Sequence, residues 1–468
     1  MKLARHFLSP LRRGRAFVAP SLGGLRRRNR LKAELHALLL LAATSLRAQA
    51  PEPSVPDTLD LKTAIGFAVQ NNFAIRQARE RIKQQEGVIV EVTSREIPNV
   101  AANASYQFND TAIAQGFPAS DRAWQINLTA SQVLYSAGGV RSVVRSSRLV
   151  REAALLDLKG VINEALLQVR TGFYAVLLAR EQIKVQESNL ELLQQQLKTA
   201  TDRFEAGTVS SFEKLRAEVA VANAKVPLIT ANNNYRLAIE SLRQVLGFTS
   251  NQPETLRKVP EFVGTLDYTP VSFDLAGAFT TAQASRPELD RLARLAEAGE
   301  EGITAARSAK YPSVSAFGGW TLRKGVTSDF GDSDNGWLIG LQSQWNIFDG
   351  RATNGRVSQA RSVLEQTKLT YTEARLAVEV EVRRAHSRWQ EATELADASQ
   401  KVVEQATEAV RLANARYGAG TSTQLDVLQA QVDLTTARIN QIQAYYSYNV
   451  AVATLRKATG QADEFVTQ

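Results

Sequence analysis

The chain contains two versions of one motif, of which the second is Arg416-Tyr417-Gly418-Ala419-Gly420-Thr421. A copy, Arg203-Phe204-Glu205-Ala206-Gly207-Thr208, lies 213 residues earlier. In both copies a glycine stands at the position where a left-handed residue commonly ends a helix. Serine and threonine residues just beyond it are suited to capping a following helix. The motif therefore predicts a tight turn between two helices, near 205–210 and again near 418–423.

The repeat covers most of the chain. Nearly the same spacing aligns Leu134-Tyr135-Ser136 with Ile347-Phe348-Asp349, and Gly247 with Gly460. A period this long is not a solenoid unit of about 20–50 residues, so it indicates a duplicated half-molecule. The predicted organisation is a leader at 1–50, a first repeat at 51–247, a linker at 248–270, a second repeat at 271–460 and a short tail at 461–468.

Each half is predicted to begin with helix and to continue with two strands. The helical stretch ends before Pro98 or Pro312, since proline stops a helix. Segments of alternating apolarity follow, at about 98–135 and 312–348, and this alternation is typical of strands. Four of the five tryptophans lie in these segments: Trp124, Trp320, Trp337 and Trp345. Apolar strand faces bounded by aromatic residues are typical of membrane-spanning strands, although soluble hairpins packed on a core fit the alternation equally well.

A very long helix is predicted after each pair of strands. No proline occurs from Gly138 to Gly207 or from Arg351 to Gly420. Roughly 67 residues at about 1.5 Å each make a rod of about 100 Å. Leu190, Leu193 and Leu197 follow the spacing of three and four residues that coiled coils use. Such rods need lateral partners.

The first 50 residues account for the positive charge of the chain. They hold eleven basic residues and one acid, so the other 418 residues carry a net charge of −1 despite the formal total of +9. The charge therefore gives no reason to expect a nucleic acid as partner. The apolar run 37–46 is too short to cross a bilayer as a helix and ends at Ala48-Gln49-Ala50, a pattern suited to signal peptidase. Export through a signal peptide is the prediction, and a basic disordered tail on a cytosolic protein is the alternative.

The residue inventory offers no basis for catalysis or for a bound cofactor. The absence of cysteine excludes disulfides, thiolate metal sites and a lipid attached through cysteine. Beyond the leader, His386 is the single histidine, so a histidine metal cluster is excluded. There is also no glycine-rich phosphate loop and no arguable Ser/His/Asp set. We therefore expect no cofactor, no metal and no enzyme.

The repeat, the order of elements and their lengths together resemble the TolC-like outer-membrane efflux proteins. The pattern Arg416-Tyr417-x-x-Gly420-Thr421-x-x-x-Leu425-Asp426-Val427-Leu428 is similar to the helical-hairpin tip of that family. The resemblance extends from about Leu59 to Gly460. It implies a mainly α protein with transmembrane β structure, in which each chain contributes a duplicated helix–strand–strand–helix–helix unit to a homotrimer. Four strands per chain would close a twelve-stranded outer-membrane β-barrel, continued by a long periplasmic α-helical barrel.

The function implied by the resemblance is that of a passive exit duct in a tripartite efflux or type I secretion system. The duct would lie in the bacterial outer membrane among its lipids, extend into the periplasm, and work with a periplasmic adaptor and an inner-membrane pump. A periplasmic coiled-coil adaptor or scaffold without a channel is the alternative, which explains the helical hairpins but not the strands. The exported substrate, whether a small toxic compound, a metal or a polypeptide, stays open.

The resemblance also assigns an aperture to the helical tips. Acidic side chains just after the second turn narrow the tunnel in the family, and Asp426 matches that position, with Glu213 as its first-half counterpart. Three chains would place six carboxylates near one ring and favour cations. Gln429 and Arg216 lie one turn further on, and Arg216 could pair with Glu213. Ordinary surface charges on a helical tip are the alternative interpretation.

Two further features of the tips match the family. Tyr417 and Phe204 match the aromatic position whose packing holds the tips closed, and a plain heptad core explains them equally well. The turns Gly207-Thr208 and Gly420-Thr421 match the surface that docks onto the adaptor.

Overall fold

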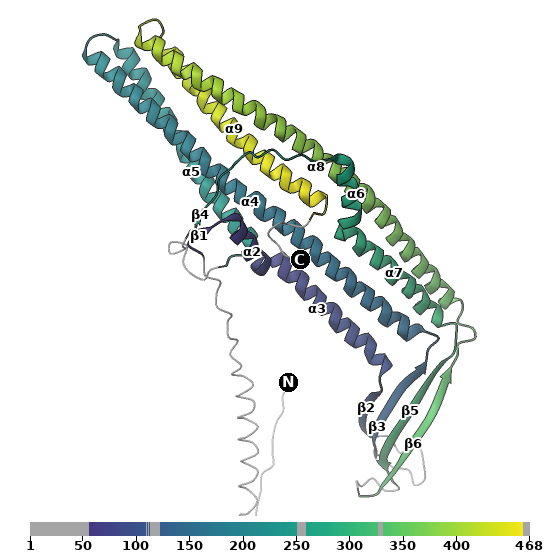
Figure 1. Ribbon diagram of the computed structural model, residues 1–468. Helices are drawn as coiled ribbons and strands as arrows, with labels where there is room; N and C mark the ends of the chain where they lie inside the picture. Colours follow the sequence, from purple (N-terminus) through teal and green to yellow (C-terminus); the bar gives the residue numbers. More distant parts are fainter. Residues whose placement is uncertain are drawn as a thin grey trace, which may run out of the picture. The chain divides into compact units, whose positions relative to one another are not determined.

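The computed structural model describes residues 56–108, 110, 112, 122–249, 259–325 and 331–461 (Figure 1). The predicted leader, part of the predicted linker and nearly all of the predicted tail lie outside the described residues. The first half contains β1 (Thr58–Leu59), α2 (Leu61–Asn71), α3 (Phe73–Thr93), the 3-10 helix η1 (Ser94–Glu96), β2 (Asn99–Phe108), β3 (Arg122–Tyr135), α4 (Gly139–Glu205) and α5 (Ser211–Leu246). The predicted linker contains β4 (Glu261–Phe262), and the second half contains α6 (Leu275–Ser285), α7 (Pro287–Ser308), β5 (Ser313–Lys324), β6 (Ser333–Gln344), α8 (Ala352–Gly418) and α9 (Gln424–Ala458). The order of helix, two strands and two long helices thus occurs twice.

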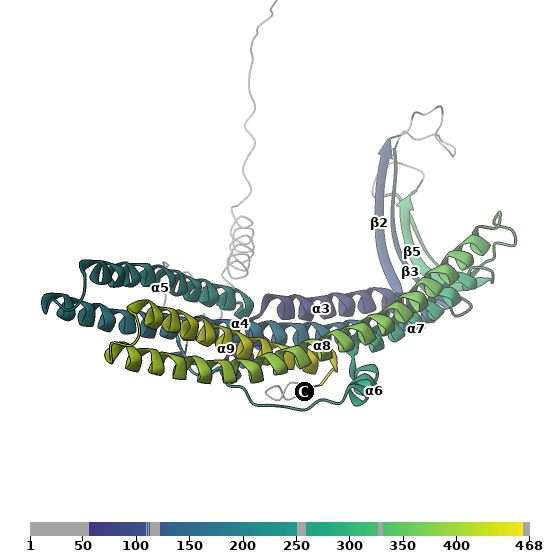
Figure 2. The ribbon, with the colours of Figure 1, turned by 90° about the horizontal axis from the view of Figure 1, so that it is seen from above.

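The longest helices of the two halves, α4 and α8, each have 67 residues. α5 folds back along α4, and α9 folds back along α8, to form two helical hairpins (Figures 1 and 2). α4 also packs along α7 and α9, so the hairpins contact each other within the chain. None of the described helices combines the length and the apolar composition that crossing a bilayer requires.

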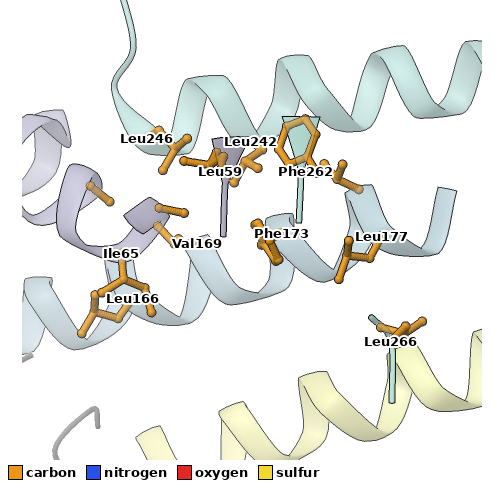
Figure 3. Close-up of a cluster of buried hydrophobic side chains, with 13 residues drawn as sticks. Leu59, Ile65, Leu166, Val169, Phe173, Leu177, Leu242, Leu246, Phe262 and Leu266 are labelled. Atoms are coloured by element: carbon orange, nitrogen blue, oxygen red, sulfur yellow. The ribbon is translucent and has the colours of Figure 1, made fainter. Parts of the chain in front are cut away.

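The main hydrophobic core lies where the start of the first half meets the middle of α4 (Figure 3). Phe173 of α4 is 2% exposed and packs among side chains of α2, α5 and the two short strands. β1 pairs in parallel with β4, which places Leu59 beside Phe262. The start of the first half is therefore joined directly to the segment that precedes the second half.

The return helix of each half ends in the same way. Gly247 and Gly460 follow α5 and α9 with φ of 73° and 71°. A side chain on Gly247 would run into the carbonyl group of Asn71, and one on Gly460 would meet Ser285 at 3.0 Å. Glycine is required at both positions, because the backbone is left-handed and a neighbouring chain lies against it.

Side chains at equivalent positions hold these two helix ends. Asn72 Nδ2 donates to the carbonyl oxygen of Val245 at 2.6 Å. Arg286 Nη1 donates to the carbonyl oxygen of Ala458 at 3.2 Å in the second half. Arg286 is buried and also reaches Glu381 at 2.7 Å. In both halves a side chain therefore donates to a carbonyl group at the end of the return helix, but this side chain is neutral in the first half and charged in the second.

The four longer strands form one antiparallel sheet in the order β2-β3-β5-β6. The two predicted hairpins are thus joined within the chain through β3 and β5. Leu128 lies opposite Trp320, and Trp320 lies opposite Trp337, so apolar residues share one face. Asn127 lies opposite Thr321 on the other face. Since Trp337 is 79% exposed, the apolar face is left largely uncovered by the described chain.

β6 ends earlier than the apolar alternation predicts. The last paired residue is Gln344, opposite Ser313 at the start of β5. Trp345 lies beyond the strand, and its indole Nε1 donates to the carbonyl oxygen of Lys310 at 3.0 Å. The alternation continues past Gln344, but β5 offers no further residues with which to pair.

A sharp bend leads from the strands into the long helices. Ala137 and Gly138 precede α4 with φ of 48° and 81°, and Gly350 and Arg351 precede α8 with φ of 64° and 71°. Two adjacent left-handed residues are unusual, and a side chain in this region costs about 1–2 kcal/mol. Each half therefore holds one non-glycine residue in an unfavourable conformation where the strand gives way to the helix.

Candidate aperture at the helical tips

The repeated motif closes the end of each long helix through hydrogen bonds. Gly207 and Gly420 both have φ of 72°, which confirms the predicted left-handed position. Thr208 donates from its backbone N and from Oγ1 to the carbonyl oxygen of Arg203, both at 2.9 Å. Thr421 makes the same two bonds to the carbonyl oxygen of Arg416, at 3.0 and 3.2 Å. Each threonine thus satisfies a carbonyl group of the helix before it, the arrangement of a Schellman turn.

Asp426 belongs to the capping box at the start of α9, whose N-cap residue is Thr423. Asp426 Oδ2 accepts hydrogen bonds from the backbone N of Thr423 at 2.8 Å and from the Ser422 hydroxyl at 2.7 Å. The backbone N of Asp426 in turn donates to the Thr423 hydroxyl, which completes a capping box. The Ser422 hydroxyl first, and then the Thr423 backbone and hydroxyl, lower the pKa of Asp426 below its usual value of 3.8. The side chain is exposed, so the tip carries an ionised carboxylate at neutral pH.

Glu213, the first-half counterpart, has a different environment. It lies in the first turn of α5 and is half-buried. Its Oε2 is enclosed and has no hydrogen-bond partner within the part of the chain that the structure describes. Ser210, at the N-cap of α5, makes no capping hydrogen bond through its side chain. Asp426 and Glu213 occupy equivalent positions in the two repeats, but within one chain their carboxylates differ in exposure and in hydrogen bonding.

The residues one turn further on have other partners. The Arg216 guanidinium lies 4.9 Å from the ring centre of Phe212, and the described residues form no ion pair between Arg216 and Glu213. Gln429 Nε2 donates to Asp433 Oδ1 at 2.9 Å. Within the described part of a single chain, Arg216 therefore does not neutralise the charge of Glu213 through an ion pair.

The two tips contact each other through motif residues. The Arg203 guanidinium lies 4.6 Å from the ring centre of Tyr417, a cation–π contact between α4 and α8. Lys214 Nζ lies 5.7 Å from the ring centre of Phe204 within the first hairpin. The sequence singles out both aromatic residues but does not show that Arg203 reaches across to Tyr417. The only signal in the sequence was that both residues lie in the repeated motif, Arg203 in its first copy and Tyr417 in its second.

Comparison with known proteins identifies the family of the chain. The family model described as "Outer membrane efflux protein" matches residues 64–248 and 279–461. The chain belongs to the outer membrane efflux protein family. This efflux protein is therefore an outer-membrane channel protein, and the family match removes the alternative of a coiled-coil adaptor without a channel.

Individual relatives cover nearly the whole length of this efflux protein. The cobalt-zinc-cadmium resistance protein CzcC of Cupriavidus metallidurans is 26% identical over 412 residues, 86% of this chain and 90% of the relative. Protein CyaE of Bordetella pertussis is 25% identical over 466 residues, 96% of each chain. The crystal structure of the Campylobacter jejuni CmeC outer membrane channel matches with a TM-score of 0.74 at 18% identity, covering 86% of this chain and 87% of that chain. The structural match confirms the predicted mainly α fold.

The tryptophans of the efflux protein's strands differ in exposure. Trp320, Trp337 and Trp345 are all more than 40% exposed. Trp124 is only 4% exposed and lies opposite Tyr106 in the sheet. The role of these residues at a membrane interface stays a prediction, and the burial of Trp124 within the single chain sets it apart from the other three.

Within the described ranges, no group of three or more histidine, aspartate or glutamate side chains is placed to hold a metal ion.

Proposed function

We propose that three copies of this chain assemble into a passive duct that carries substrates from an inner-membrane pump and a periplasmic adaptor to the outside. The observation that carries the proposal is the uncovered four-stranded sheet. Its apolar face is exposed, and within the described chain its edge strands β2 and β6 each have one unpaired side. Open edges invite further pairing. Pairing β6 of one copy with β2 of the next satisfies both edges and closes a barrel whose apolar face meets lipid.

The long helices support the same assembly. Exposed apolar residues recur along α5 and along α8 on faces that the chain leaves uncovered. They include Val219, Val226, Ile229 and Leu237 on α5, and Leu369, Leu376, Leu395 and Val402 on α8. Several are spaced by three, four or seven residues, as in a coiled coil. Burying these stripes between copies stabilises the assembly, since each Å² of apolar surface removed from water contributes about 25 cal/mol.

The tips supply the narrowest part of the proposed duct. Threefold symmetry brings three exposed Asp426 carboxylates toward one axis, which favours the passage of cations. The half-buried Glu213 contributes less in the arrangement of the single chain. Arg203 and Tyr417 hold the two hairpins of each copy together at this level.

The turns at the tips are proposed to dock onto the adaptor. A Cβ atom placed on Gly207 or on Gly420 would meet no described atom within 4 Å, so both turns are open to a partner's backbone. The energy for transport comes from the pump in this proposal. Efflux of small compounds or metals and secretion of polypeptides both fit such a duct.

Planar-bilayer recording of the detergent-purified protein tests the proposal. We expect a trimer with a small, cation-preferring conductance. Asp426→Asn removes the charge but keeps an oxygen that can cap the helix, so it should weaken the cation preference without unfolding the tip. Asp202→Asn is the matched control, because Asp202 is an exposed acid near the same tip but outside the proposed ring. A soluble monomer without conductance would refute the proposed duct. If Asp426→Asn and Asp202→Asn changed the cation preference equally, the proposed ring of Asp426 carboxylates would be refuted.

A further inference from the structure

A cavity lies where β3 passes into α4, outside the tip region. It has a volume of about 410 Å³. Its wall contains Arg95 of η1, Arg141 of the first turn of α4 and the last three residues of β3, Val133, Leu134 and Tyr135. Nothing in the proposed duct mechanism uses this cavity.

The cavity has a surplus of positive charge. Arg95 and Arg141 are both exposed and form no ion pair within the described residues, and Glu96 is the single acid in the cavity wall. Two of the arginines further along α4 do have partners: Arg145 lies 2.8 Å from Glu301, and Arg151 lies 2.8 Å from Glu86. The two guanidinium groups at the cavity are therefore available to an external anion. Arginine suits phosphate because its planar fork can donate two parallel hydrogen bonds.

The same cavity has an apolar wall. Val133, Leu134 and Tyr135 are 40%, 59% and 52% exposed. They lie at the end of a strand whose alternation marks it as membrane-spanning in the proposed duct. Exposed apolar side chains and two cations without an ion-pair partner among the described residues line the same cavity, and this combination matches a molecule with a phosphate group attached to acyl chains. A free anion would not need the apolar wall.

We propose that this cavity binds the headgroup of an anionic phospholipid in the leaflet that faces the periplasm. The inference rests on the proposed function, because it requires β3 to cross the membrane. Arg95 and Arg141 bind the phosphate, and Leu134 and Tyr135 contact the upper part of the acyl chains. Each bound lipid fixes the bend between strand and helix at a position where Ala137 already has a left-handed backbone.

The second half of the chain lacks this site. The residues that align with Arg95 and Arg141 are Ala309 and Asn354. Nearby, Trp345 bonds to the carbonyl oxygen of Lys310. The site therefore occurs once per chain, and the second half supplies a pair of substitutions that the same fold already accepts at the equivalent positions.

Native mass spectrometry of the purified trimer, titrated with phosphatidylglycerol or with phosphatidylcholine of the same acyl chains, tests the inference. We expect saturation at one tight phosphatidylglycerol per chain. The double variant Arg95→Ala/Arg141→Asn should bind it about thirtyfold more weakly, since each basic residue near an anionic membrane surface contributes about a five- to sixfold gain in affinity. The double variant Arg148→Gln/Arg361→Gln is the control. Both residues are exposed and outside the cavity wall, and Arg148 lies about 10 Å further along α4 than Arg141. The control should bind within about twofold of the unaltered protein.

Three results would overturn the inference: equal losses in the two double variants, equal binding of the two lipids, or full competition by inorganic phosphate at the same concentration as the lipid. Bilayer conductance of the same preparations separates this inference from the proposed function. If the unaltered trimer conducts but the lipid results fail, only the lipid site is wrong. If it does not conduct, the duct itself is wrong.

Discussion

Replacing Gly247 by alanine is expected to destabilise the protein by more than its backbone conformation alone explains. Gly247 has φ of 73°, and alanine in the left-handed region costs about 1–2 kcal/mol. In addition, the new Cβ would lie 2.9 Å from the carbonyl carbon of Asn71 and 3.1 Å from Cα of Asn72, and closer still to the Asn71 carbonyl oxygen. Backbone atoms cannot turn aside as a flexible side chain does, so overpacking adds about 1–3 kcal/mol. The expected total is about 2–5 kcal/mol.

Alanine substitutions at two other glycines, Gly207 and Gly87, separate the cost of the backbone conformation from the cost of the steric clash. Gly207 has nearly the same φ, 72°, but no described atom lies within 4 Å of an added Cβ, so Gly207→Ala should cost only the conformational part of about 1–2 kcal/mol. Gly87 lies inside α3, also with open space around it, and Gly87→Ala should stabilise the protein by up to about 1 kcal/mol through helix propensity. Thermal unfolding of the detergent-solubilised protein, followed by the helical circular dichroism signal, ranks the three variants. If Gly207→Ala lowers Tm as much as Gly247→Ala does, the steric argument is refuted.

Three further outcomes are expected. Glu381→Gln should destabilise the protein by about 1–2 kcal/mol, because buried Arg286 loses one of its two carboxylate partners, keeps Glu288 as the other, and Glu381 is itself partly exposed. Burial acts to raise the pKa of Glu381, but Arg286 and Lys457 outweigh it and hold that pKa below 4.5. The contribution of Glu381 is therefore present above pH 4.5 and lost as pH falls through the lowered pKa, and Tm of the variant should lack that part of the pH dependence. Arg351→Gly should raise Tm by the equivalent of about 1 kcal/mol through relief of its φ of 71°, and an unchanged or lower Tm would contradict the strain at this bend. Because the pKa of Asp426 lies below 3.8, the cation preference measured by reversal potential should persist to about pH 4 and decline only below it, and a decline near pH 6 would contradict the assignment.

Local patterns in the sequence predicted much of the fold. The spacing of apolar residues and the absence of proline predicted two long helices, which the structure shows with 67 residues each. Glycine at 207 and 420 predicted left-handed turns, because only the absence of a Cβ makes that conformation cheap. Alternating apolarity predicted the four strands. These features depend on neighbours within one or two helical turns or a few strand residues, which a sequence displays directly.

Parts of the candidate site depended on residues distant in the sequence. The motif places Asp426 and Glu213 at equivalent positions, yet one lies exposed in a capping box and the other is enclosed. The contact between Arg203 and Tyr417 requires two hairpins to meet, which periodicity within either hairpin cannot show.

The sequence alone was enough to predict that this protein contains one helix–strand–strand–helix–helix unit twice, because each element has a local period and each turn has a local residue requirement. The tertiary structure was needed to show which strands pair, with β3 beside β5, and that Asn72 and Arg286 both bond to the end of the return helix of their half. The physical reason is that pairing and burial are set by contacts between segments far apart in the chain. A repeated sequence fixes equivalent positions, but each position acquires its chemistry from the neighbours that the fold brings to it.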